Sequence, residues 1–81
     1  MPKNRKHPEL LALKGRIREE KTSYEEIAKK VGMDKSTFSN KINGYSAFTT
    51  DEVHAIVDLL NIRQDNIVRY FFPDMLRNES R

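Results

Sequence analysis

The segment 23–44 constrains the fold of this chain most, because it has the pattern of two short helices joined by a tight turn. Ser23 has the chemistry of a helix N-cap, and Glu26, three residues later, can return a hydrogen bond to the Ser23 amide. Gly32 stands where a left-handed residue ends a helix without a side-chain penalty. The apolar residues of the first helix recur on one face of a 3.6-residue period: Ile27, Ala28 and Val31.

The second helix of the segment is expected from Lys35 to Ile42, with Asp34 as its cap and Gly44 as its stop. It has one thin apolar stripe, Phe38 and Ile42, and no acid from Lys35 to Lys41. Its other side chains can donate to phosphates and base edges: Lys35, Ser36, Thr37, Ser39, Asn40 and Lys41. The alternative is that these six side chains form only a hydrophilic surface.

The same segment resembles the helix-turn-helix of the lambda-repressor and Cro-like (XRE-type) family. The resemblance implies an all-α, five-helix domain in which the second motif helix enters the major groove of DNA. Tyr24 departs from the pattern, because the family often has a phosphate-contacting Gln there. The matching residues are Glu26-Ile27-Ala28, Val31-Gly32-Met33, Ser36-Thr37-Phe38-Ser39 and Ile42-Asn43-Gly44.

The helix face that points away from Phe38 and Ile42 should meet the groove, and its leading turn should go deepest. We therefore expect base contacts from Lys35, Ser36 and Asn40, which also match the family's base-contacting positions. The expected DNA-backbone contacts flank this face or follow the helix: Tyr24, Thr37, Ser39, Lys41, Tyr45 and Ser46.

Charge separates the two halves of the chain. Residues 1–44 hold eleven Lys or Arg against six Asp or Glu, whereas residues 45–81 hold four against six. The half that contains the motif is therefore the basic one, which suits a polyanionic partner. Eighty-one residues without cysteine predict a single domain in a reducing cytoplasm. No apolar run approaches the roughly 20 residues of a membrane span.

Residues 1–8 carry Lys3, Arg5 and Lys6 without an apolar anchor, and we expect a flexible arm. It either lies along DNA phosphates or is a solvated tail. The domain then runs from 9 to 73. Three helices are expected outside the motif. The first covers 9–21, and the second follows a cap at Thr50, with Thr49 as the competing cap. The third runs from Gln64 to Phe72. Residues 74–81 are expected to be a tail.

The apolar face of the last expected helix is wider than one small core needs. Val68 and Phe72 are therefore expected at a homodimer interface, with a wholly intramolecular core as the alternative. His7 and His54 have no carboxylates at ligand spacing, so no metal is expected. No acid–base cluster, activated nucleophile or glycine-rich phosphate loop is evident, which argues against an enzyme, a cofactor or a small-molecule ligand.

These expectations describe a sequence-specific regulator of transcription that binds operator DNA as a homodimer, in the manner of a short phage or prophage repressor. A different class stays open: a helical protein-interaction module, such as an antitoxin or adaptor, in which DNA binding is secondary or lost.

Overall fold

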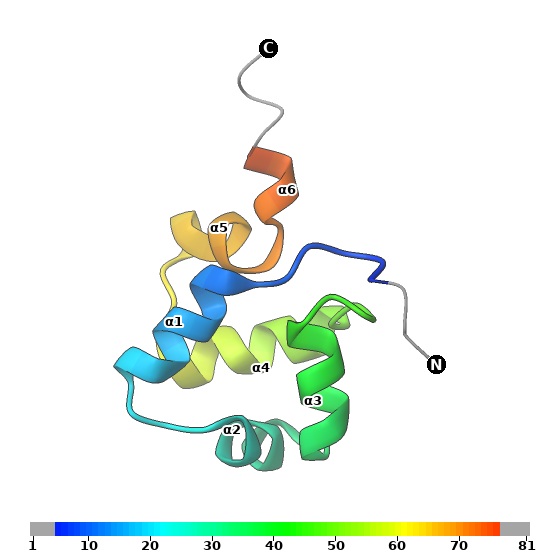
Figure 1. Cartoon of the computed structure of the whole chain (residues 1–81). Coiled ribbons are helices and arrows are strands. Elements are labelled where there is room, and N and C mark those ends of the chain that lie inside the picture. Colours follow the sequence, from blue (N-terminus) through cyan, green and yellow to red (C-terminus); the bar gives the residue numbers. More distant parts are fainter. Residues whose placement is uncertain (1–4, 77–81) are drawn as a thin grey trace.

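The computed structural model describes residues 5–76, and every regular element in that part is helical (Figure 1). The all-α class predicted from the sequence is therefore confirmed. The elements are α1 (Leu11–Glu19), α2 (Tyr24–Val31), α3 (Lys35–Ile42), α4 (Thr50–Leu60), the 3-10 turn η1 (Gln64–Asn66), α5 (Ile67–Phe71) and α6 (Pro73–Leu76).

One apolar core joins these helices. Phe38 lies at its centre, fully buried, and its ring packs 5.4 Å from Tyr24 and 5.5 Å from Phe48 between centroids. Phe48 in turn meets Phe71 edge-on at 5.9 Å. This row of four rings runs from α2 to α5 and holds the fold together across its length. The buried apolar residues are Leu10, Leu13, Ile17, Ile27, Ala28, Phe38, Ile42, Ile56, Leu60, Ile62 and Phe71.

Helix α4 begins one residue earlier than its expected cap allowed. Thr49, not Thr50, is the N-cap: its hydroxyl accepts from the Glu52 amide at 3.1 Å. The Glu52 carboxylate accepts from the Thr49 amide at 2.9 Å, which completes a capping box. The acid three residues after Thr49 decides between the two threonines, because only that register lets both hydrogen bonds form.

The last expected helix, 64–72, is divided in the structure. It begins as the 3-10 turn η1, continues as α5 and stops before Phe72, whose φ of −136° and ψ of 55° are not helical. Pro73 causes the break, because its ring disfavours a helical residue before it. Proline is well suited to the first position of a new helix. Residues 73–76 therefore form α6, where a tail was expected; the rest of that tail, 77–81, lies outside the described residues.

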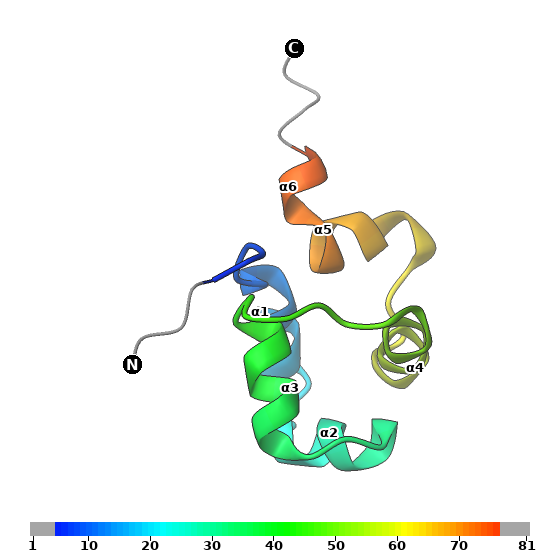
Figure 2. The same cartoon turned by 90° about the vertical axis from the view of Figure 1, so that its right-hand side faces the viewer.

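Helix α2 is far from α5 and α6 in the molecule. Helix α2 lies at one end of the molecule and α5 with α6 at the other, in both views (Figures 1 and 2). Helix α3 runs along the side from the α2 end toward the α5 end. Its N-terminal turn is therefore remote from the apolar residues of α5.

Candidate nucleic-acid interface

Helices α2 and α3 form a helix-turn-helix unit whose two ends are fixed by their sequence. Ser23 caps α2, since its hydroxyl accepts from the Glu26 amide at 3.1 Å. The reciprocal hydrogen bond expected from Glu26 is replaced, because its carboxylate accepts from the hydroxyl of Thr22 at 2.9 Å. Gly32 ends α2 with a φ of 86°, as expected for a left-handed stop. The unit is closed by Ile27, Ala28, Phe38 and Ile42, all buried.

The expected base-contacting residues lie on the side of α3 that faces away from the core. Lys35 and Ser36, on its leading turn, are exposed. Asn40 lies one turn further along and is half-buried. Phe38 and Ile42 hold the opposite side of α3 in the core. The division into an apolar and a polar side is the one that the sequence pattern predicts.

Asp34 occupies the N-cap position of α3, but its side chain makes no capping hydrogen bond to the backbone. Its carboxylate instead accepts from the hydroxyl of Ser36 at 2.8 Å and from the hydroxyl of Thr37 at 3.0 Å. The Ser36 and then the Thr37 hydrogen bonds hold the Asp34 pKa below its ordinary value. An anion thus lies on the leading turn, next to the exposed ammonium of Lys35.

Lys41, expected to contact phosphate, is engaged within the protein. Its Nζ lies 2.6 Å from Glu52 Oε1, and the two side chains are only 14% and 21% exposed. The same carboxylate completes the cap of α4 at Thr49. Lys41 therefore joins the last turn of α3 to the first turn of α4, and its charge is offset within the protein.

The C-terminal end of α3 is fixed further through Asn43. Its Oδ1 accepts from the Lys14 ammonium at 2.5 Å, and its Nδ2 lies 3.3 Å from the hydroxyl of Ser39. Lys14 also forms an ion pair with Glu9, and it holds the Glu9 pKa below its ordinary value. Ser39, another expected phosphate contact, is thus half-buried and bonded within its own helix end.

Residues 5–8 differ from the flexible arm that the sequence suggested. The amides of Lys6 and His7 both donate to the carbonyl oxygen of Gly44 at 2.9 Å, and Arg5 Nε donates to the Asn43 carbonyl at 2.7 Å. Pairing satisfies carbonyl groups that the end of α3 leaves open, which is why this segment docks there. Lys3, the first expected arm residue, lies outside the described residues.

Gly44 makes this docking possible. Its φ is 93°, and a Cβ at this position would overlap the carbonyl oxygen of His7 and press on Arg5. A glycine was expected here only as a helix stop. Its second role, contact with a segment almost forty residues earlier in the chain, has no local sequence signal.

The remaining residues expected to contact the DNA backbone differ in exposure and in their neighbours. Tyr24 is half-buried and packs its ring against Phe38. Tyr45 is half-buried, with the guanidinium carbon of Arg5 5.3 Å from its ring centroid. Ser46, directly after it, is exposed. Arg5, Tyr45 and Ser46 thus lie together at the C-terminal end of α3.

Arg16 has a structural role that the sequence did not identify. Its Nη2 donates to the Leu60 carbonyl at 2.5 Å, at the end of α4, and its Nε donates to Glu20 at 3.0 Å. Its Nη1 lies 3.5 Å from the Tyr70 hydroxyl. Arg16 thus joins α1, α4 and α5.

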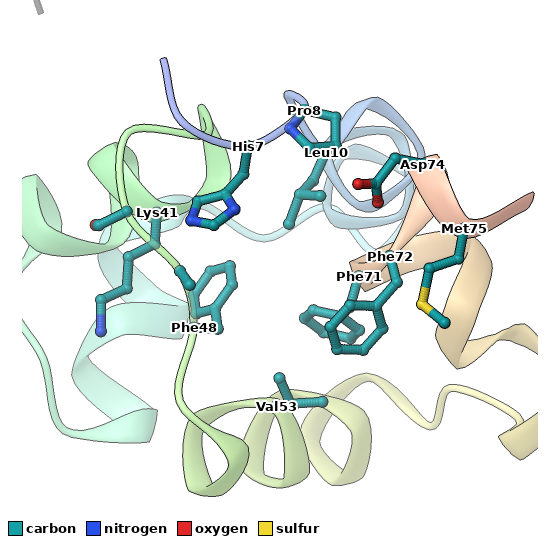
Figure 3. Close-up of a pocket in the computed structure, with 12 residues that line it drawn as sticks. His7, Pro8, Leu10, Lys41, Phe48, Val53, Phe71, Phe72, Asp74 and Met75 are labelled. Carbon is teal, nitrogen blue, oxygen red and sulfur yellow. The ribbon is translucent and has the colours of Figure 1, made fainter. Parts of the chain in front are cut away.

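The expected dimer residues lie at the other end of the molecule. Val68 is 36% exposed and Phe72 43% exposed, while Phe71 is buried. Phe72 and Met75, 56% exposed, border a cavity of about 310 Å³. Figure 3 shows the rings of Phe48, Phe71 and Phe72 around this hollow, with Val53 of α4 below them in the view. The polar side chains at its edge are His7, Lys41, Ser46 and Asp74.

Two further properties concern only residues 5–76. No group of three or more His, Asp or Glu side chains is arranged there to hold a metal ion. No helix in this range is both long and apolar enough to cross a bilayer.

A family model described as "Protein of unknown function (DUF739)" matches residues 9–74, which is most of the chain. No curated protein and no solved structure matches the chain.

Proposed function

We propose that this chain, which belongs to the DUF739 family of proteins of unknown function, is a sequence-specific DNA-binding regulator. In this proposal α3 enters the major groove of operator DNA and α2 crosses the sugar–phosphate backbone. The resemblance of the segment 23–44 to the lambda-repressor and Cro-like helix-turn-helix agrees with the proposal, as does the basic charge of residues 1–44.

The observation that carries the proposal is the difference between the two ends of α3. Its C-terminal end is tied to α1, to α4 and to residues 5–7, whereas its leading turn projects Lys35 and Ser36 into solvent. A helix held in this way presents one end to a partner in a fixed orientation. Base readout needs such an orientation, because hydrogen bonds to base edges depend on sub-ångström placement.

Unpaired cations on α2 and α3 agree with this face. Lys29, Lys30 and Lys35 lie on these helices, are exposed and form no ion pair with any of residues 5–76. Four other exposed cations of this range are also unpaired and lie elsewhere in the fold: Lys6, Arg18, Lys21 and Arg69. Lys14, Arg16 and Lys41 are each paired with a carboxylate instead. Unpaired cations release counterions when they meet phosphates, and this release gives the affinity its salt dependence.

Assembly as a homodimer is part of the proposal. Val68 and Phe72 are exposed apolar side chains at the end remote from α2, so two copies can pair there without covering α3. Two-fold pairing would present two α3 helices to half-sites about 34 Å apart, one turn of duplex.

A helical protein-interaction module is the second candidate. The observation that favours it is the same apolar region, because Phe72 and Met75 border a cavity and are largely exposed. In an antitoxin or adaptor this region would bind a different protein, and DNA contact would be secondary or lost.

Selection of bound duplexes from a random pool tests the proposal against this alternative. The DNA-binding account predicts a recovered site with two related half-sites. It also predicts a log–log salt dependence of the affinity with a slope of about −0.9 per neutralised phosphate. Recovery of unrelated sequences, without salt-dependent binding, would favour the interaction module.

A further inference from the structure

Two hydroxyl groups on the leading turn of α3 share one acceptor, Asp34. Ser36 Oγ lies 2.8 Å from its Oδ2, and Thr37 Oγ1 lies 3.0 Å from its Oδ1. An ionised carboxylate has lone pairs but no proton, so each contact requires the proton of the hydroxyl. Each hydroxyl is therefore a donor toward Asp34 and keeps only lone pairs for another partner.

Two features keep this arrangement in place at neutral pH. Asp34 is exposed, and its pKa is lowered by the Ser36 hydroxyl and then by the Thr37 hydroxyl, so the carboxylate is ionised. Ser36 is exposed, whereas Thr37 is half-buried. Ser36 is thus the hydroxyl whose remaining lone pairs are open to a partner in solution.

We infer that Ser36 reads DNA as a hydrogen-bond acceptor that selects a base with an exocyclic amino group, adenine or cytosine. The inference rests on the proposed function and specifies the chemistry of one of its contacts. In the major groove adenine presents N6–H₂ and cytosine N4–H₂, whereas guanine O6 and thymine O4 at the corresponding positions can only accept. A serine without a carboxylate partner could satisfy either kind of base by rotating its hydroxyl.

The charge of Asp34 acts in the same direction. A carboxylate on the leading turn repels phosphate oxygens and the keto oxygens of guanine and thymine, and it attracts the positive end of an amino N–H bond. Thr37 donates to the same carboxylate, so its hydroxyl has no proton left for a phosphate. The phosphate contact expected of Thr37 conflicts with this geometry.

The test uses the duplex recovered by selection and the Ser36→Ala variant, which removes an exposed hydroxyl and leaves the core intact. The variant should relax the preference at one base pair per half-site. At that position, exchange of adenine for guanine, or of cytosine for thymine, should raise the Kd of the wild-type protein about two- to tenfold, as for one neutral hydrogen bond. The same exchange should leave the Kd of Ser36→Ala unchanged.

Base analogues identify the atom. At an adenine, replacement by purine, which lacks the amino group, should weaken the wild-type protein and not Ser36→Ala. Replacement by 7-deazaadenine, which lacks the N7 acceptor, should affect both proteins equally. The opposite result, a loss confined to 7-deazaadenine, would overturn the inference, because it would show Ser36 donating. A cytosine at that position is tested in the same way with 2-pyrimidinone.

Asp34→Ala tests the source of the polarity. Without the carboxylate, the Ser36 hydroxyl is free to donate as well as to accept. The variant should therefore bind duplexes with guanine or thymine at this position nearly as tightly as those with adenine or cytosine. Thermal unfolding checks that the variant is folded. An unchanged preference in this folded variant would contradict the role of Asp34. A selection that recovers no site at all would overturn the proposed function as well as the inference. Two results would overturn the inference alone. One is a recovered site with guanine or thymine at the position that Ser36→Ala relaxes, and the other is a site with no such position.

Discussion

The ammonium of Lys41 lies 2.6 Å from the carboxylate of Glu52, and this pair joins the end of α3 to the beginning of α4. Glu52 also accepts from the Thr49 amide, so one carboxylate serves the helix cap and the ion pair together. Lys41 was expected to neutralise phosphate. Its position gives it a structural role instead, one that fixes the orientation of α3.

Replacing Lys41 by Ala should therefore lower the stability of the free protein. We expect a loss of about 1 kcal/mol, the upper part of the range for exposed pairs, because this pair is largely buried. Urea unfolding measures the change. Lys35→Ala is the matched control, since Lys35 is exposed and forms no ion pair with any of residues 5–76, and it should stay within about 0.5 kcal/mol of wild type. Equal stability of the two variants would argue against a structural role for Lys41.

The stability contributed by Glu52 should depend on pH. Burial alone would raise the pKa of Glu52, but its hydrogen bonds from Lys41 and Thr49 bring it below the ordinary value of 4.5. A carboxyl group with a lowered pKa in the folded state stabilises the fold above its unfolded pKa, and this stabilisation is lost as the pH falls through the folded pKa. The free energy of unfolding of the wild-type protein should thus decrease as the pH is lowered below 4.5.

Glu52→Gln isolates this group from Glu9 and Asp34, whose pKa values are lowered as well. The gap in stability between wild type and Glu52→Gln should be largest at neutral pH and should shrink as the pH falls below 4.5. A gap that stays constant from pH 7 to 3 would contradict the assigned hydrogen bonds.

Gly44→Ala should displace residues 5–8 from the end of α3. The new Cβ would overlap the His7 carbonyl, and the positive φ would strain any L-residue by about 1 kcal/mol or more. Faster amide hydrogen exchange at Lys6 and His7, with lower stability, is the expected result. Gly15→Ala is the control, because no atom of residues 5–76, apart from its chain neighbours and the backbone of its own helix, lies within 4 Å of its would-be Cβ. That helical substitution should stabilise the protein by about 0.5–1 kcal/mol.

The helix-turn-helix could be predicted from the sequence because its signals are local. Ser23 and Gly32 each fix a helix end through their own backbone chemistry, and the spacing of Phe38 and Ile42 determines which side of α3 is buried. The exposed positions of Lys35 and Ser36 follow from the same periodicity. Most of the helix boundaries outside α5 and α6 were also predictable to within about two residues.

The parts that could not be predicted depend on contacts between distant segments. Lys41 meets Glu52, Lys14 meets Asn43, and Arg16 meets Leu60 only once the helices have packed. Lys41, which was expected to contact phosphate, is used inside the fold for this reason. The division of the last helix was readable in part, since the helix was expected to end at Phe72, but a new helix beginning at Pro73 was not expected.

Phe72→Glu tests the dimer interface proposed at α5. Phe72 is 43% exposed and lies outside the core, so the variant should remain folded while losing self-association. Sedimentation velocity at several concentrations, with circular dichroism as a check on folding, measures both properties. Arg69→Gln is a control, because it changes an exposed residue of α5, three positions before Phe72, without removing apolar surface. A dimer that survives Phe72→Glu unchanged would remove Phe72 from the interface.

The ratio of specific to non-specific affinity for Lys35→Ala tests the central claim most directly. It is measured on the selected duplex and on a random duplex at one salt concentration. Lys30→Ala serves as the matched control, because Lys30 is an exposed cation on α2 that pairs with no acid in the described range, 5–76. If the leading turn of α3 reads bases, Lys35→Ala should weaken the selected duplex by about 1–3 kcal/mol and lower the ratio. Lys30→Ala should weaken both duplexes about equally. A wild-type ratio in Lys35→Ala would contradict the assignment of α3 as the helix that reads DNA.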